Sequence, residues 1–407
     1  MTRSALWRNR DFVHLWSAYT VSEFGSQITL LALPLTAIGV LHASVFEISV
    51  LSTFSLLPML LFGPLAGVWV DRRRHRPVLV AADFVRFALL GSVPVAYGLG
   101  ALTLAQLYAV AFLAGVMQML FLVASHAYIP SLLEREHLIG ANTRLETSRA
   151  LAGTGGPGFG GVLVNLVSAP VAIAGDALSF LFSGLAILSI RHREPPPHAE
   201  PAASVARELR EGLRYVFSDP ILRANVLSAG PANFSYGITW GVLIVFAVRD
   251  LGLHAAAIGL ILSLAQLGGL TGAALAGRLS RRFGLGPTMI AACMLVGPDT
   301  LIVALAPRSA PIPSLALGWG LGSFTSIVTG IVGVSIRQAI VPLRLQGRVV
   351  GSIRWIILGV VPLGSAAGGA LASHVGLRDT LLVSAGIAFV TAVPLVLSPL
   401  RRLRTID

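Results

Sequence analysis

The sequence predicts an all-α integral membrane protein with twelve transmembrane helices in two pseudo-symmetric halves of six. Hydrophobic residues make up 55% of its 407 residues and charged residues only 12%, against about 25% in ordinary soluble domains. Such a chain has too little polar surface to cover a water-soluble globule, and lipid is therefore its expected solvent. A sequence repeat indicates the two halves: Leu65-Ala66-Gly67 leads to Pro77, and about half a chain length later Leu275-Ala276-Gly277 leads to Pro287.

Twelve apolar runs are long enough to cross a hydrocarbon core of ~30 Å. The first follows a basic N-terminus, is too long for a signal-peptide core and lacks a small-residue cleavage site, so we expect it to remain as a helix. The fifth begins with charge and is interrupted by glycines. In chain order, the expected helices are 12–39, 46–70, 77–98, 102–127, 142–167, 170–190, 221–248, 256–279, 287–306, 312–336, 348–373 and 376–399.

Arginines gather in alternate connections between these runs, which predicts the orientation of the chain. The arginine-poor connections hold only Arg249, Arg308 and Arg378. We therefore expect a bacterial inner-membrane protein with both termini in the cytoplasm. The arginine-rich segments are the N-terminus, 71–76, 134–144, 191–223, 278–282, 337–348 and the C-terminus.

One long connection divides the chain into an N-terminal half, 1–190, a cytoplasmic linker, 191–220, and a C-terminal half, 221–407. The linker begins as a proline-rich polar spacer. Its second part, Ser204 to Phe217, has apolar residues on one side of a helix and charged residues on the other. This pattern predicts an amphipathic helix along the inner leaflet.

Glycines spaced Gly-x-x-x-Gly recur once in every third helix and suit close helix approach. With 43 glycines in the chain, chance is an equal explanation. The pairs are Gly63/Gly67, Gly156/Gly160, Gly268/Gly272 and Gly364/Gly368.

These features together resemble the major facilitator superfamily over essentially the whole chain. The segment Gly63–Arg76 is similar to that family's loop motif at Gly63, Leu65, Ala66, Gly67, Asp71, Arg72 and Arg76, and departs from it at Arg74. The glycine-rich fifth helix, with Gly156, Pro157, Gly160 and Gly161, resembles the packing motif of drug:proton antiporters. Segments Asp176–Phe180, Glu211–Tyr215 and Gly347-Arg348 resemble the macrolide-efflux and siderophore-export branch.

The resemblance implies a secondary transporter that exports a lipophilic small molecule, such as a drug, antibiotic or siderophore-like metabolite, by proton antiport with alternating access. It also implies a conformational latch formed by Gly63, Gly67, Asp71, Arg72 and Arg76, in which Asp71 meets the positive N-terminal end of helix 11 near Gly347. One departure concerns helix 4, which lacks the membrane arginine of many such antiporters and offers Gln118 and His126 instead.

Ionisable groups within the spans are candidates for proton coupling, because lipid disfavours the charged form. Glu23 lies near the middle of helix 1 and shares a face with Tyr19 and Gln27; it is a candidate proton carrier or ligand. Asp176 is another candidate, for which a structural hydrogen-bonding role is equally plausible. Asp299 is the third; it follows Pro298, and the alternative is a location near the outer surface. Asp83 and Arg86 are three apart and predict a local structural pair. Arg149 and Arg354 are the predicted buried basic groups.

Aromatic and amide side chains within the spans suit a large amphipathic substrate. About half of such groups serve helix packing instead. The substrate-cavity candidates are Tyr19, Gln27, Gln118, Asn233, Tyr236, Trp240 and Gln266.

Other function classes are disfavoured. The Gly-x-Gly-x-x-Gly at 153–158 lies within a span, where no dinucleotide-binding strand and helix can form. The chain has no lysine for a P-loop and no visible nucleophile–base or metal cluster, so we expect neither an enzyme nor a cofactor. The net charge of +12 resides in loops beside lipid and does not indicate nucleic acid. We expect a monomer whose partners are substrate, protons and the bilayer; the alternative is an importer or uniporter on the same fold.

Overall fold

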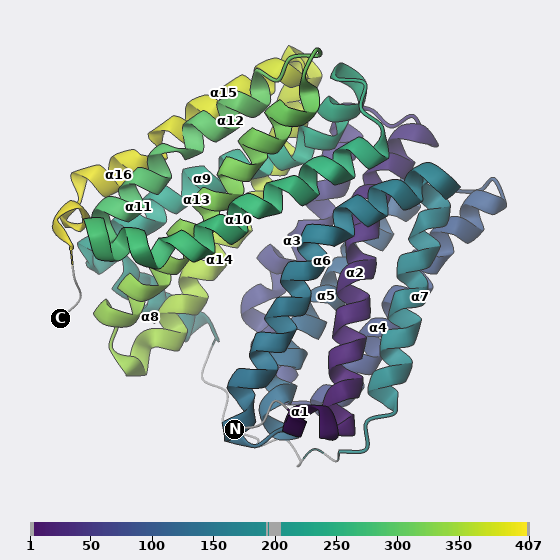
Figure 1. Ribbon diagram of the computed structural model, residues 1–407, viewed down its shortest axis with the longest axis horizontal. Coiled ribbons are helices and arrows are strands. Elements are labelled where there is room, and N and C mark those ends of the chain that lie inside the picture. The colour runs from purple at the N-terminus through teal and green to yellow at the C-terminus, as the bar shows by residue number, and fades with distance from the viewer. Residues whose placement is uncertain (1–3, 193, 195–204, 405–407) are drawn as a thin grey trace. The chain divides into compact units, whose positions relative to one another are not determined.

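The computed structural model describes residues 4–192, 194 and 205–404, which form helices and no strands (Figure 1). Within these residues, twelve helical segments are long and apolar enough to cross a membrane, which confirms the predicted fold class and the number of spans. They are Arg10–Gly39 (α2), Val45–Asp71 (α3), His75–Gly98 (α4), Leu104–Leu132 (α5), Arg135–Val167 (η1 and α6), Ala169–Leu188 (α7), Pro220–Asp250 (α9 and η2), Ala255–Phe283 (α10), Leu285–Ala304 (α11 and α12), Pro311–Ile340 (α13), Leu343–Val375 (α14) and Leu377–Leu397 (α15, η3 and α16).

Three shorter elements lie outside the spans: α1 (Ser4–Arg8), α8 (Val205–Ser218) and η4 (Pro399–Arg402). Several helix starts follow from local chemistry. Asn9 and Thr103 cap α2 and α5 by accepting a backbone N–H with their side chains, and Asp219 caps α9 just before Pro220. The expected linker, 191–220, includes residues 193 and 195–204, which lie outside the described part of the chain.

The chain forms two compact units. Unit 1 comprises Met1–Ala43, Phe54–Ala202 and His254–Leu260, and unit 2 comprises Ser44–Thr53, Ala203–Leu253 and Ile261–Asp407. The first turns of α3 therefore belong to unit 2 and the rest of that helix to unit 1. The first turns of α10 belong to unit 1 and the rest of that helix to unit 2.

In unit 1, α2 runs between α6 and α7 (Figure 1), and α4 packs on α5 and α7. Glycines permit the contact between α2 and α6. A Cβ on Gly156 would meet the Gln27 side chain, and one on Gly160 would lie 3.1 Å from the Cα of Ile28. Gly161 faces the backbone of Ala255 in the first turn of α10. The glycine-rich motif thus brings three helices together.

In unit 2, α9 packs on α14 and α15, and α12 runs beside α15 (Figure 1). The contact between α9 and α14 is backbone to backbone. A Cβ on Gly237 or Gly364 would lie 3.1 Å from the Cα of the other, and Gly368 approaches Ile238. Gly268 and Gly272 pack on α13 in the same way.

One expectation about close packing is wrong. Gly67 makes no close approach: a Cβ placed there would meet no described atom within 4 Å. The apolar side of α8 packs on protein, since Val216 is fully buried in a cluster with Leu222 of α9 and Val349 of α14. The expected location of α8 along the inner leaflet stays a prediction.

We predict that Gly364→Ala destabilises the protein, because its Cβ would run into the backbone carbonyl of Phe234 and the Cα of Gly237. Overpacking of this kind costs about 1–3 kcal/mol, and thermal unfolding in detergent should shift down by several degrees. Gly386→Ala in α15 is the matched control, since its Cβ would find open space in the described structure and alanine favours helix. An unchanged midpoint for Gly364→Ala would contradict the tight contact.

Candidate functional site

A buried ion pair lies midway along α4. Asp83 and Arg86 are 0% and 2% exposed, and Arg86 Nη2 lies 2.5 Å from Asp83 Oδ1. The hydroxyl of Ser183 in α7 donates to Asp83 Oδ2 at 2.6 Å. The predicted local pair is therefore present, and a second helix, α7, adds a hydrogen bond to its acid.

Arg86 also joins α5 to this group. Its Nη1 donates to Gln118 Oε1, and its guanidinium lies over the rings of Phe121 and Phe180, 4.7 and 4.0 Å from their centroids. Gln118 was a cavity candidate, and the structure places its carbonyl on this cation. Because an acid, an amide and two aromatic faces surround it, the guanidinium is stabilised away from water.

Asp176 lies where α7 meets α2. It is 1% exposed, and it accepts hydrogen bonds from Thr29 of α2 and, at 3.1 Å, from Ser179. A Cβ on Gly25 would lie 2.5 Å from its Oδ1, so α2 can approach only because that position is glycine. The carboxylate thus fills a tight helix contact.

Glu23 differs from both buried acids. It is half-buried on α2, and none of the residues described here donates a hydrogen bond to its carboxylate. Its electrostatic neighbours are Arg149 of α6 and Arg86 of α4. Tyr19, one turn earlier, is buried, and Gln27, one turn later, packs against Gly156. Glu23 is thus a partly accessible acid held on a well-packed helix.

The two predicted buried basic groups are not enclosed by protein. Arg149 is exposed and pairs with Glu146, three residues earlier, at 2.7 Å. Arg354 of α14 is also exposed. Position along a helix indicated their depth in the span but not whether neighbouring helices cover them, and their location within the membrane stays a prediction.

Unit 2 contains a cluster of three aromatic rings. Tyr236 and Trp240 of α9 and Trp319 of α13 have ring centroids 5.9–6.1 Å apart. Tyr236 is 47% exposed and the two tryptophans are half-buried, so part of the cluster is accessible. Sequence reasoning identified the first two and missed Trp319; the available signal was a tryptophan between Gly318 and Gly320 in an apolar span.

The remaining candidates in unit 2 have different local environments. Asp299 is buried where α12 meets Gly318 and Gly322 of α13, and it accepts a hydrogen bond from Thr300 at 2.8 Å. Asn233 donates to the carbonyl of Ala229 at 2.9 Å. Gln266 of α10 is exposed.

The loop motif has one clear structural role in unit 1. Arg76 donates to the carbonyls of Ile187 and Leu188 at the end of α7, and its backbone N–H donates to Glu194. The start of α4 is thereby fixed to the end of α7. Asp71 and Arg72 are exposed, and the latch stays a prediction.

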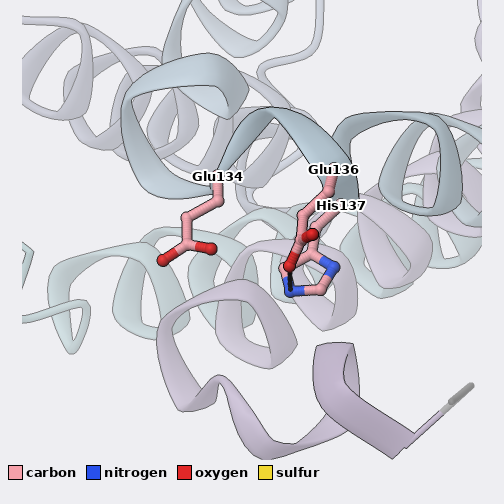
Figure 2. A group of neighbouring side chains, drawn as sticks. All are labelled: Glu134, Glu136 and His137. Carbon is pink, nitrogen blue, oxygen red and sulfur yellow. Dashed lines mark ion pairs between the residues drawn. The ribbon is translucent and has the colours of Figure 1, made fainter. Parts of the chain in front are cut away.

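Glu134, Glu136 and His137, between α5 and α6, are close enough to share a metal ion (Figure 2). The two glutamates are exposed, and the ion pair drawn joins only Glu136 and His137, at 3.6 Å. Exposed acids of this kind are common without a metal, and we assign no site to them.

The whole chain is similar to known transporters. The family model described as "Transmembrane secretion effector" matches residues 2–407. The chain is 27% identical over 400 residues to "Multidrug efflux pump Tap" of Mycolicibacterium fortuitum, covering 97% of this chain and 96% of that protein. It is 25% identical over 400 residues to the MFS-type transporter YfiS of Bacillus subtilis (strain 168), covering 93% and 91%.

Solved structures share the fold. A bacterial homologue of the iron transporter ferroportin, in its inward-facing state, gives a TM-score of 0.76 at 18% identity, covering 95% of this chain and 98% of that one. A bacterial homologue of the human lysosomal transporter Spinster gives 0.73 at 14% identity and covers 98% of both chains. At such identities the likeness shows the fold alone.

We predict that Asp83→Asn strongly destabilises the protein, because it leaves the Arg86 cation buried without its acid. Breaking a buried pair in this way costs about 3–5 kcal/mol. The exposed pair offers the control: Glu146→Gln should change stability by less than about 1 kcal/mol. Thermal unfolding in detergent measures both, and equal midpoints for the two variants would show that the Asp83–Arg86 pair is not stabilising.

Proposed function

The chain belongs to the transmembrane secretion effector family of the major facilitator superfamily, and on that premise we propose that it exports a lipophilic small molecule in exchange for protons. The superfamily resemblance seen in the sequence is confirmed, and the protein is a multi-pass membrane transporter and not an enzyme. The export direction is supported by the similarity to a multidrug efflux pump over 97% of the chain.

The observation that carries the substrate class is the aromatic cluster of Tyr236, Trp240 and Trp319. Rings 5.9–6.1 Å apart form a broad apolar surface, of which Tyr236 is 47% exposed. Flat apolar molecules bind such surfaces by stacking, and a positive charge on the molecule adds attraction to the ring faces. We assign the cluster to substrate binding.

Proton coupling is assigned to Glu23. Asp176 and Asp299 are buried and accept hydrogen bonds from neighbouring hydroxyl groups, whereas Glu23 is partly accessible and has no such donor among residues 4–192, 194 and 205–404. A carboxylate in mid-membrane is disfavoured when charged. Glu23 would therefore take up a proton on one side of the membrane and release it where water reaches it from the other.

The arginine distribution supports a cytoplasmic location for both termini and for the linker, 191–220, in a bacterial inner membrane. In this orientation the Gly63–Arg76 loop lies on the cytoplasmic side, where the latch would act. Transport would proceed by alternating access of a monomer whose halves are 1–190 and 221–407.

We predict that Trp319→Ala weakens substrate binding by about tenfold, which corresponds to about 1.4 kcal/mol, because stacking and buried area are lost together. Trp319→Phe should retain most of the affinity. Binding of a flat lipophilic dye to the purified protein, followed by dye fluorescence, measures both. Everted vesicles with an acidic interior should take up the same dye; if they do not, proton-driven export of this substrate class is wrong.

We predict that Glu23→Gln abolishes pH-driven uphill transport and leaves downhill exchange of a neutral substrate largely intact. Glutamine keeps shape and hydrogen bonding but cannot titrate. Dye accumulation in everted vesicles under a proton gradient is the measurement, and Glu134→Gln, an exposed acid between α5 and α6, is the control. Should Glu23→Gln still concentrate dye under a proton gradient alone, coupling belongs to Asp176 or Asp299.

A further inference from the structure

The linker helix α8 is attached to unit 2 by its apolar side. A Cβ on Gly212 would lie 2.5 Å from the carbonyl oxygen of Arg348, so α8 and α14 touch through their backbones. Ser352 donates to the carbonyl of Leu209 at 3.3 Å, and the Tyr215 hydroxyl donates to that of Ile340 at the end of α13, also at 3.3 Å. The orientation of α8 about its own axis is therefore fixed.

The acidic side of α8 is also occupied. Arg348 Nη1 lies 2.7 Å from Glu211 Oε2, and its Nη2 lies 3.5 Å from Glu208 Oε1. These are the only two acids in α8. Both pair with Arg348 of α14, and no ion pair joins either of them to an arginine of α8 in the described structure.

A basic face remains. Arg207, Arg210 and Arg214 recur at i, i+3 and i+7, which places them along one side of a helix. All three are exposed, and no ion pair joins them to any residue in the described ranges. Phe217 continues the same side at i+10 and is 44% exposed. The face therefore combines three exposed arginines with one apolar ring.

The C-terminal end of α8 lies next to a candidate span. α8 ends at Ser218, and the span of α9 begins at Pro220. Amphipathic helices at a membrane surface bind the leaflet through basic groups and apolar or aromatic anchors, and anionic lipid headgroups attract arginines close to that surface.

We propose that the face formed by Arg207, Arg210, Arg214 and Phe217 binds the headgroups of anionic phospholipids in the adjoining leaflet. The apolar side of the helix holds α8 on α14 and so presents the arginines outward. This lipid-binding proposal does not depend on the proposed transport roles, because the surface includes neither the aromatic cluster nor Glu23.

The test uses full-length protein carrying an environment-sensitive fluorophore at Ser218→Cys, since Cys293 is buried. Titration with phosphatidylglycerol in neutral-lipid mixed micelles should give a saturable signal that phosphatidylcholine does not. The triple variant Arg207→Gln/Arg210→Gln/Arg214→Gln should weaken phosphatidylglycerol binding at least tenfold. The corresponding arginine-to-lysine triple should bind within about threefold of the parent, because its charge is kept.

The matched control is Arg278→Gln/Arg281→Gln/Arg282→Gln, which removes three exposed arginines from the end of α10. It should change binding by less than about twofold. Equal loss in both triple variants would show a diffuse charge effect and overturn the proposal, as would unchanged binding in the α8 triple. Soluble glycerol phosphate should give no signal at the same concentration; saturable binding of it would identify a free-phosphate site instead of a lipid surface.

Discussion

The structure depends on the enclosure of charge within helix contacts, because the hydrocarbon core offers no water to solvate a polar group. Arg86 is the clearest case. Its guanidinium binds Asp83 in its own helix, Gln118 in α5 and the ring of Phe180 in α7. A single cation thereby fixes the spacing of three spans, and α7 in turn holds α2 through Asp176 and Thr29. The position of Glu23 on α2 follows from that chain of contacts.

Small residues impose the complementary constraint in unit 2. Gly237 and Gly364 allow α9 and α14 to touch through their backbones, and Ser235 of α9 donates to the carbonyl of Ser384 in α15 at 3.0 Å. One contact is made by backbone atoms and the other by a hydrogen bond. Helices in lipid associate through such contacts, because burying apolar side chains against each other there gives no net driving force. The α9 backbone is therefore held on two sides.

The sequence predicted the spans closely because membrane insertion depends on local hydrophobicity, which is summed along the chain. Helix ends were less accurate: the fifth span begins at Arg135 and not at 142, since its first turns are polar. Contacts across helices were hardest. Gly67 packs on nothing described, Arg149 and Arg354 are exposed and not covered by neighbouring helices, and Trp319 was missed. Each error concerns which neighbour a side chain meets, and periodicity along one helix carries no information about the next.

The two proposed functional side chains are presented in the same way. Tyr236 stands between Ser235, which is bound to α15, and Gly237, which is packed on α14. Glu23 is followed two residues later by Gly25, which is packed against Asp176 of α7. In both cases the backbone is fixed by small residues while the large or charged side chain remains partly accessible. Because the backbone is already fixed, less conformational entropy is lost when a ligand or proton binds. In the proposed substrate role, rings held in this way would bind chemically varied apolar molecules, because they supply area without directional hydrogen bonds.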